Sequence, residues 1–314
     1  MSTVGEIRSA DTDAQVSASS PRGTGAPGDR GRIRRSRRER DDRRKTWIMS
    51  TVGVLLLAFP LGPIVWMVST AFKPNSEVFA SPPRLIAENP TLQAFANVLF
   101  DPEKLRIFGN SYLVATCTVI LTLLLAVHAA YAFSRFEFPG KRIINVCVIA
   151  TQAVPPITLL IPFLGLIVLA GLFNSYAGLI LVYIVFTLPY CTIMLTAYFN
   201  GVPRELDESV KVDGGNAFTA LWRVIIPVSG PGLVSVGVYA FIIAWNEYLF
   251  ALSLTRTIDM RTVPIGIDLL MGQHAYEWNE IMAMSILGCL PVIVVFAIFQ
   301  RYVVAGLAAG AVKG

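Results

Sequence analysis

Charged side chains are scarce in this sequence. Asp, Glu, Lys and Arg form 15% of the 314 residues, whereas about a quarter is usual in soluble domains. The 61 consecutive residues 143–203 contain none of the four. Hydrophobic residues form 54% of the chain, and the mean hydropathy is +0.60. This composition excludes a soluble globular domain and predicts an all-α membrane protein that crosses the bilayer several times.

Cysteine and histidine are also rare, and neither is arranged for chemistry. There are two histidines, and the four cysteines lie in apolar segments without CxxC spacing, at Cys117, Cys147, Cys191 and Cys289. Structural disulfides and a metal site are therefore not expected. A phosphate-binding P-loop is missing too, because Gly140-Lys141 is followed by Arg142 and lacks the upstream glycine. We expect no cofactor, no metal and no catalytic residues in this chain.

The charge that is present gathers at the N-terminus. Residues 1–46 hold 12 Lys and Arg against 7 Asp and Glu, and they include few large apolar side chains. Such a segment cannot bury enough surface to offset its ordering entropy, so we predict a disordered tail. Its basic block, Arg30–Lys45, ends at the first apolar segment. Binding to nucleic acid or anionic lipid is one interpretation; we favour a cytoplasmic flank that fixes the topology, with no nucleic-acid partner.

Six segments are long and apolar enough to cross a bilayer, which takes about 20 residues each. These predicted spans are residues 47–72, 107–133, 143–172, 176–199, 224–245 and 281–300. Pro155 and Pro156 interrupt the third one, where proline removes an intrahelical hydrogen bond. We expect a break there that faces the interior of the protein, because a break is tolerated in a membrane only where neighbouring helices or a cavity satisfy the freed carbonyls.

The distribution of basic residues predicts the orientation. With the N-terminus inside the cell, the two internal connections on that side are short and carry three Lys or Arg each, in residues 135–142 and 204–223. Two of the three connections on the other side are longer and sparser in basic residues, and the third, residues 173–175, has none. Because Lys and Arg mark cytoplasmic connections, we expect both termini of this multi-pass protein in the cytoplasm.

The connection between the fourth and fifth spans predicts a docking element. In the loop 203–223, Pro203 suits the first turn of a helix and Glu205 suits its positive end. Gly214-Gly215 is typical of a helix end, and Asn216 can cap a second helix. A short helix, a sharp turn and a second helix would form a surface for a partner protein; the alternative is an ordinary loop on the lipid headgroups.

The same loop resembles a known motif. Glu208 is followed by Gly214 and, after twelve further residues, by Pro227. This spacing is similar to the EAA motif of ABC importer permeases, which reads Glu-Ala-Ala, three residues, Gly, nine residues and Ile-x-Leu-Pro. Ser209 and Val210 stand where the motif has its two alanines.

Other stretches resemble sugar permeases of the maltose-transporter G-subunit type, with the greatest likeness to actinobacterial trehalose and other disaccharide permeases. They are residues 72–75, 110–111, 129–141, 245–248 and 300–314. The resemblance covers roughly residues 47–314 and implies a six-helix permease domain of a type I ABC importer in the bacterial plasma membrane.

The resemblance also implies the partners and the function. The chain would be one permease subunit of an ATP-driven carbohydrate importer, in contact with membrane lipid. It would work with a second, homologous permease, two ATP-binding subunits and an extracytoplasmic sugar-binding protein. The residues implied in coupling to the ATPase are Glu205, Glu208, Lys211, Asp213, Gly214 and Gly215.

The residues of the substrate path are less defined. Pro155 and Pro156 are candidates from the expected break, and Asn246 and Glu247, at the end of the fifth span, are candidates for the mouth of the path or a contact with the binding protein. The alternative for this pair is an aromatic belt with a solvated carboxylate.

Three other functions remain open at this level. An ion-coupled secondary carrier is disfavoured because the third and fourth spans contain no charged residue. A membrane scaffold or receptor would leave solute uptake unchanged on deletion. An ABC permease for a non-sugar solute, such as glycerol phosphate, polyols or oligopeptides, would have the same architecture.

Overall fold

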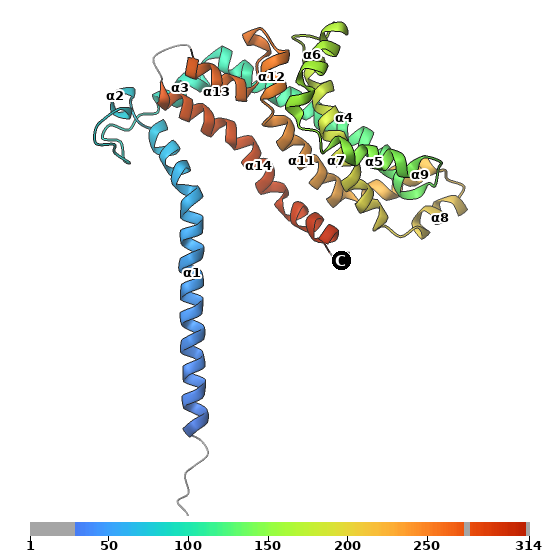
Figure 1. The fold of residues 1–314 in the computed structure, drawn as a ribbon, viewed down its shortest axis with the longest axis horizontal. Helices are drawn as coiled ribbons and strands as arrows, with labels where there is room; N and C mark the ends of the chain where they lie inside the picture. Colours follow the sequence, from blue (N-terminus) through green and yellow to red (C-terminus); the bar gives the residue numbers. More distant parts are fainter. Residues whose placement is uncertain (1–28, 273–276, 312–314) are drawn as a thin grey trace, which may run out of the picture. The chain divides into compact units, whose positions relative to one another are not determined.

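The computed structural model describes residues 29–272 and 277–311, and every regular element in these ranges is helical (Figure 1). The helical elements are α1 (Asp29–Ala71), α2 (Asn75–Val78), α3 (Gln93–Leu99), α4 (Pro102–Arg135), α5 (Lys141–Thr151), η1 (Pro156–Leu159), α6 (Leu160–Leu169), α7 (Tyr176–Asn200), α8 (Glu205–Val212), α9 (Ala217–Ala220), η2 (Leu221–Ile225), α10 (Ile226–Val228), α11 (Gly230–Trp245), α12 (Leu249–Leu254), η3 (Ile258–Met260), α13 (Val263–Gly272) and α14 (Trp278–Ala311). The chain divides into two units, residues 1–62 and 63–314.

The six predicted spans correspond to four continuous helices and two bent pairs. Four helical stretches are long and apolar enough to cross a membrane: Lys45–Ala71, Pro102–Arg135, Tyr176–Asn200 and Trp278–Tyr302. Two further pairs pass the same test together but are bent, so that the described residues hold up to six spans. The all-α membrane architecture predicted from the composition is therefore confirmed.

The N-terminal region differs from the prediction in part. We expected disorder through residue 46, yet α1 is helical from Asp29 onward; residues 1–28 of the predicted tail lie outside the described residues. Between Arg32 and Val52 the sequence has no proline or glycine and is rich in Arg. Arg, Lys and Glu have good intrinsic helix propensity, and a helix is extended more easily than it is nucleated. The apolar helix that follows can thus continue backward into the charged segment.

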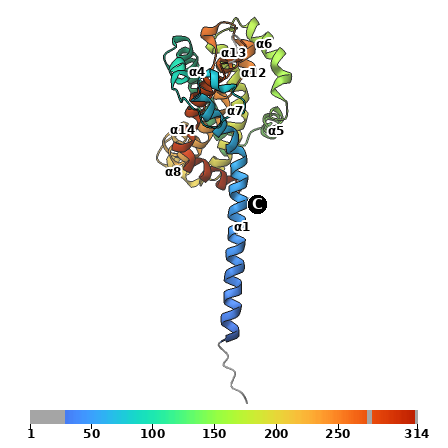
Figure 2. The ribbon, with the colours of Figure 1, turned by 90° about the vertical axis from the view of Figure 1, so that its left-hand side faces the viewer.

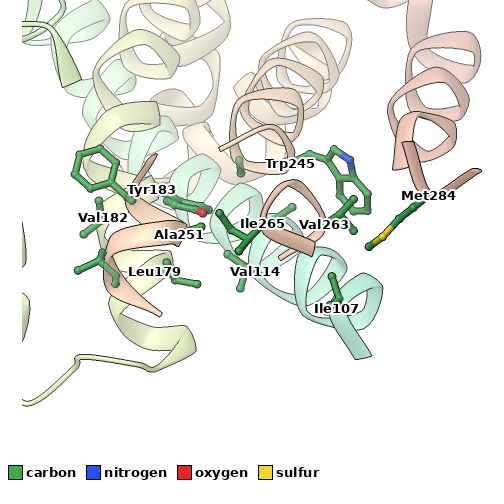
Figure 3. Packing of buried hydrophobic residues seen from close by; sticks show 14 of the residues in the cluster. Ile107, Val114, Leu179, Val182, Tyr183, Trp245, Ala251, Val263, Ile265 and Met284 are labelled. Atoms are coloured by element: carbon green, nitrogen blue, oxygen red, sulfur yellow. The ribbon is translucent and has the colours of Figure 1, made fainter. Parts of the chain in front are cut away.

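The second unit is held together by α4, α7, α11 and α14. One apolar cluster of this bundle contains residues of α4, α7, α12, α13 and α14, as well as Trp245 at the end of α11 (Figure 3). The Trp245 indole Nε1 donates a 2.9 Å hydrogen bond to the carbonyl of Gly288, which joins α11 to α14. The hydroxyls of Thr122 and Thr187 lie 2.9 Å apart and join α4 to α7. Both contacts are buried, so each satisfies polar groups that would otherwise be costly in an apolar interior.

The predicted break of the third span is confirmed. The helix α5 ends at Thr151, and the next helical segment, Pro156–Leu169, runs at 101° to it. Pro155 has extended backbone angles, and Pro156 occupies the first turn of η1. Because proline lacks an N–H and restricts the residue before it, the chain can restart a helix here but cannot continue one.

The fifth predicted span is a bent pair of helical stretches rather than one continuous helix. The sequence predicts a span from Val224 to Trp245, but the helical stretch 217–228 ends within it, and α11, which begins at Gly230, runs at 81° to that stretch. Pro231 lies in the first turn of α11 and Pro227 in the first turn of α10. Each proline lacks the N–H that an uninterrupted helix would need, so the helix ends and restarts at Ser229.

The two ends of the second unit carry different short elements. In Figure 1 and Figure 2, α8 lies at one end of this unit, which we call the α8 end, and α6, α12 and α13 lie at the other, which we call the α13 end. The helix α4 bears an ion pair near each of its termini. Lys104 pairs with Glu280 of α14, and Arg135 pairs with Asp207 of α8.

Candidate functional site

The loop 203–223 forms the predicted helix–turn–helix. The helix α8 is followed by a turn in which Gly214 has a φ of +79°, the left-handed region that favours glycine. Asn216 then caps α9, with its Oδ1 accepting a 2.9 Å hydrogen bond from the backbone N–H of Thr219. A turn of π-helix, η2, continues the second helix. The helix–turn–helix expected from Gly214 and Asn216 is therefore present.

The two glycines of the turn are needed for different reasons. At Gly214 an added Cβ would meet nothing within 4 Å, so only the positive φ restricts this position. At Gly215 an added Cβ would lie 2.5 Å from Cγ1 and 2.9 Å from the carbonyl oxygen of Val210. The turn thus folds back on α8 so closely at Gly215 that a side chain has no room.

The predicted coupling residues lie on an exposed surface. Glu205, Glu208, Lys211 and Asp213 are all exposed, and so is Gly214. Exposed apolar side chains accompany them: Val212 is 87% exposed, Phe218 63% and Trp222 41%. The His128 ring lies 6.2 Å from the Phe218 ring and 5.8 Å from the Trp222 ring. Large apolar groups next to charged ones at the surface are typical of a protein interface.

Asp207 of the same helix is the residue that the sequence reasoning missed. Its side chain is buried, and both carboxylate oxygens are used. The Tyr131 hydroxyl donates a 2.7 Å hydrogen bond to Oδ1, and Arg135 Nε donates a 2.8 Å hydrogen bond to Oδ2. The signal in the sequence was that Tyr131 and Arg135, four residues apart, share one face of a predicted helix.

The Arg135 guanidinium makes further contacts. It donates a 2.9 Å hydrogen bond to the carbonyl of Val202 and a 3.1 Å one to the Ser134 hydroxyl. That hydroxyl in turn donates to Asn200 at the end of α7, at 2.7 Å. The end of α4, the end of α7 and the start of the loop therefore meet at Arg135. A cavity of about 140 Å³ lies beside these groups, lined by residues of α4, α8 and α9.

The predicted path residues lie apart from this loop. Pro155 and Pro156 are exposed at the break of the third span, so within this chain the break does not face the interior as predicted. Asn246 is also exposed, and its side-chain amide donates a 2.8 Å hydrogen bond to the carbonyl of Ile242. Glu247 caps α12, with its carboxylate accepting 2.8 and 2.9 Å hydrogen bonds from the backbone N–H groups of Phe250 and Ala251. Glu247 is thus a helix-capping residue here, rather than the solvated carboxylate of one interpretation.

In the part of the chain that the structure describes, no group of three His, Cys, Asp or Glu residues is placed to bind a metal ion.

Comparison with known proteins gives a match of residues 118–308 to the family described as the binding-protein-dependent transport system inner membrane component. The chain belongs to this family. It is therefore a membrane-spanning permease component of a transport system of the ABC type, and the predicted resemblance is confirmed.

Several relatives in this family match over most of their length. The sulfoquinovosyl glycerol transport permease SmoH of Agrobacterium fabrum is 38% identical, covering 83% of this chain and 91% of that protein. The trehalose/maltose transport permease MalG of Thermococcus litoralis is 35% identical, covering 85% and 97%. The trehalose transport permease SugB of Mycobacterium tuberculosis is 36% identical, covering 86% and 99%.

A solved structure supports the fold independently. A bacterial ABC transporter that imports the acidic polysaccharide alginate matches with a TM-score of 0.73, covering 84% of this chain and 98% of that one. The sequence identity is 22%, so this similarity bears on the fold alone.

Proposed function

We propose that this chain is a permease subunit of an ATP-driven carbohydrate importer in the bacterial plasma membrane, with both termini in the cytoplasm. Family membership carries the proposal, together with relatives that transport sulfoquinovosyl glycerol, trehalose and maltose. The subunit works with a second, homologous permease, two ATP-binding subunits and an extracytoplasmic sugar-binding protein. In this arrangement the α8 end faces the cytoplasm and the α13 end faces the binding protein.

Coupling to the ATPase is assigned to α8 and the turn after it. The exposed row of Glu205, Glu208, Lys211 and Asp213 offers charges, and the exposed Val212, Phe218 and Trp222 side chains offer apolar area. Gly214, where an added Cβ would meet none of the surrounding atoms within 4 Å, leaves room for a partner to approach the turn closely. When ATP closes the ATPase dimer, α8 moves with it, and the two permeases swing between inward- and outward-facing states. Nucleotide chemistry belongs to the ATPase subunits, and this chain is not an enzyme.

Growth on defined sugars tests the function. A strain lacking this gene, complemented by the wild-type chain, is given a panel that includes trehalose, maltose and glycerol phosphate. We expect loss of growth on at least one sugar in the deletion strain, and the same loss when the ATPase gene is deleted. Uptake that is abolished by an uncoupler but survives loss of the ATPase would indicate an ion-coupled carrier. A deletion strain with unchanged uptake of every solute would indicate a scaffold or receptor.

Pro155→Ala is expected to impair sugar uptake more than membrane insertion. Pro155 and Pro156 both contribute to the break, and alanine at 155 restores one backbone N–H and relaxes the limit on residue 154, while Pro156 still keeps α5 from running on. Uptake in intact cells is compared with the amount of protein in the membrane fraction. Wild-type uptake per molecule of inserted protein would show that Pro155 has no part in transport.

Asn246→Cys tests the outer mouth of the path. The side chain at this position is exposed, just past the end of α11. We expect the cysteine to react with a water-soluble maleimide. The rate of this labelling reaction should change when ATP is added. Phe100→Cys is the control, because residue 100 is exposed just after α3. Its labelling rate is expected to be the same with and without ATP. A cysteine at 246 that is unreactive in every state would remove Asn246 from the path.

A further inference from the structure

The helix α8 has few fixed connections to the rest of the bundle. It is eight residues long, and its flanking segments contain Gly201 on one side and Gly214 and Gly215 on the other. Leu206 packs against an apolar cluster, but an apolar contact permits sliding. A helix attached in this way would rotate or bend its own loop when a partner displaces it, unless a directional contact holds it.

Asp207 supplies that directional contact. In the described part of the chain, it is the one α8 side chain that hydrogen bonds or pairs with a membrane-spanning helix. Tyr131 and Arg135, on the same face of α4, each hold a different carboxylate oxygen, so the orientation of α8 is defined as well as its position. The side chains of Arg135 and Asp207 are only 7% and 8% exposed. Water screens such a pair little, and removing one partner leaves an uncompensated charge.

The helix that receives this contact spans the unit from end to end. The 34-residue α4 packs along α7 and α11, and Lys104 near its other terminus pairs with Glu280 of α14. A displacement of α8 that is passed to Arg135 therefore reaches the α13 end through one continuous helix. The alternative route runs through the chain after α8, which bends by 81° at Ser229 before α11 begins.

We propose that Asp207 is a positioning residue for energy coupling. Its ion pair with Arg135 joins α8 to α4, so that movement of α8 by the ATPase moves α4 and the helices packed on it. This rests on the proposed function, in which α8 is the ATPase contact. Asp207 itself points into the bundle, whereas Glu205 and Glu208 on the same helix face outward.

The test uses the complete transporter in proteoliposomes, with the sugar identified by the growth panel. Asp207→Asn keeps the size of the side chain and its hydrogen bond from Tyr131 but removes the charge that Arg135 pairs with. We expect the ATPase subunits to co-purify as with wild type, while the number of sugars transported per ATP falls about tenfold, within the range seen when a coupling contact is lost. Asp207→Glu keeps the charge and is expected to retain most of the wild-type ratio.

Two further variants separate coupling from general damage. One variant reverses both charges, with Asp207→Arg and Arg135→Asp together. It is expected to transport more sugar per ATP than either single substitution. Glu137→Gln is the matched control, because Glu137 is an exposed acid beside the same end of α4 that pairs with Lys141. Its ratio is expected to equal that of wild type.

The outcomes distinguish this inference from the function it rests on. If the wild-type transporter shows no ATP-driven sugar uptake, the proposed function is wrong. If wild type transports but Asp207→Asn keeps the wild-type ratio, or Asp207→Glu is as impaired as Asp207→Asn, the coupling role of Asp207 is wrong and the function stands. Loss of the ATPase subunits from Asp207→Asn would also overturn it, since Asp207 would then serve assembly.

Discussion

Gly214→Asp is expected to reduce sugar uptake to background while the protein still inserts and accumulates. The φ of +79° costs a residue with a side chain on the order of 1 kcal/mol, and aspartate is among the residues that tolerate this region best. Among the described residues, and apart from Gly214 and its two chain neighbours, no atom lies within 4 Å of the position that a Cβ would take. Backbone strain alone is therefore too small to abolish uptake. We assign the larger effect to the contact with the ATPase, since a charged side chain would prevent its close approach to the turn.

The chain provides a matched control in Gly140→Asp. Gly140 lies in the other predicted cytoplasmic connection, has a φ of +83° and would likewise place its Cβ in open space. Its substitution carries the same backbone cost without touching α8, so uptake should stay near the wild-type level. Uptake per molecule and co-purification of the ATPase are measured for both variants. Normal uptake by Gly214→Asp, with the ATPase still bound, would refute the assignment of coupling to this turn.

Gly232→Ala is expected to lower the melting temperature of the purified protein strongly. Gly232 lies in the first turn of α11, and its added Cβ would come within 2.6 Å of two ring atoms of Tyr198 on α7. The ring cannot move away freely because it is packed against the apolar cluster at the α8 end. Overpacking of this kind costs about 2 kcal/mol. The helices α7 and α11 must then separate, and both belong to the core of the bundle.

Gly230→Ala isolates the steric effect. It lies two residues earlier in the same helical turn, and its added Cβ would meet nothing within 4 Å. We expect its melting temperature to change little, since alanine restricts the unfolded chain while Pro231 disfavours helical angles for a preceding residue with a Cβ. Thermal unfolding in detergent, followed by tryptophan fluorescence, compares the two variants. Equal melting temperatures would mean that α7 and α11 do not approach each other as closely as the structure indicates.

The architecture was largely predictable because membrane insertion depends on local properties of the chain. An apolar run of sufficient length must be helical in a bilayer, since each backbone group has to be satisfied within its own segment. The break at Pro155 and Pro156 and the turn at Gly214 follow for the same reason, because each rests on the backbone limits of a single residue type. The extent of the helix before residue 47 was harder to predict, since its charged residues suit both a helix and a solvated tail.

Contacts between segments far apart in the sequence could not be predicted from local properties. Asp207 stands among acidic residues that are exposed, and nothing local separates it from Glu208. The two residues differ because α4, whose Arg135 lies 72 residues earlier, packs against Asp207 and buries its carboxylate. Glu208 stays exposed. Glu247 is similar, since its role depends on where the chain turns back into α12. The sequence by itself determined the apolar segments, the break in the third span and the turn at Gly214; the tertiary structure decided which charges are paired, because burial is a property of the packed helices together.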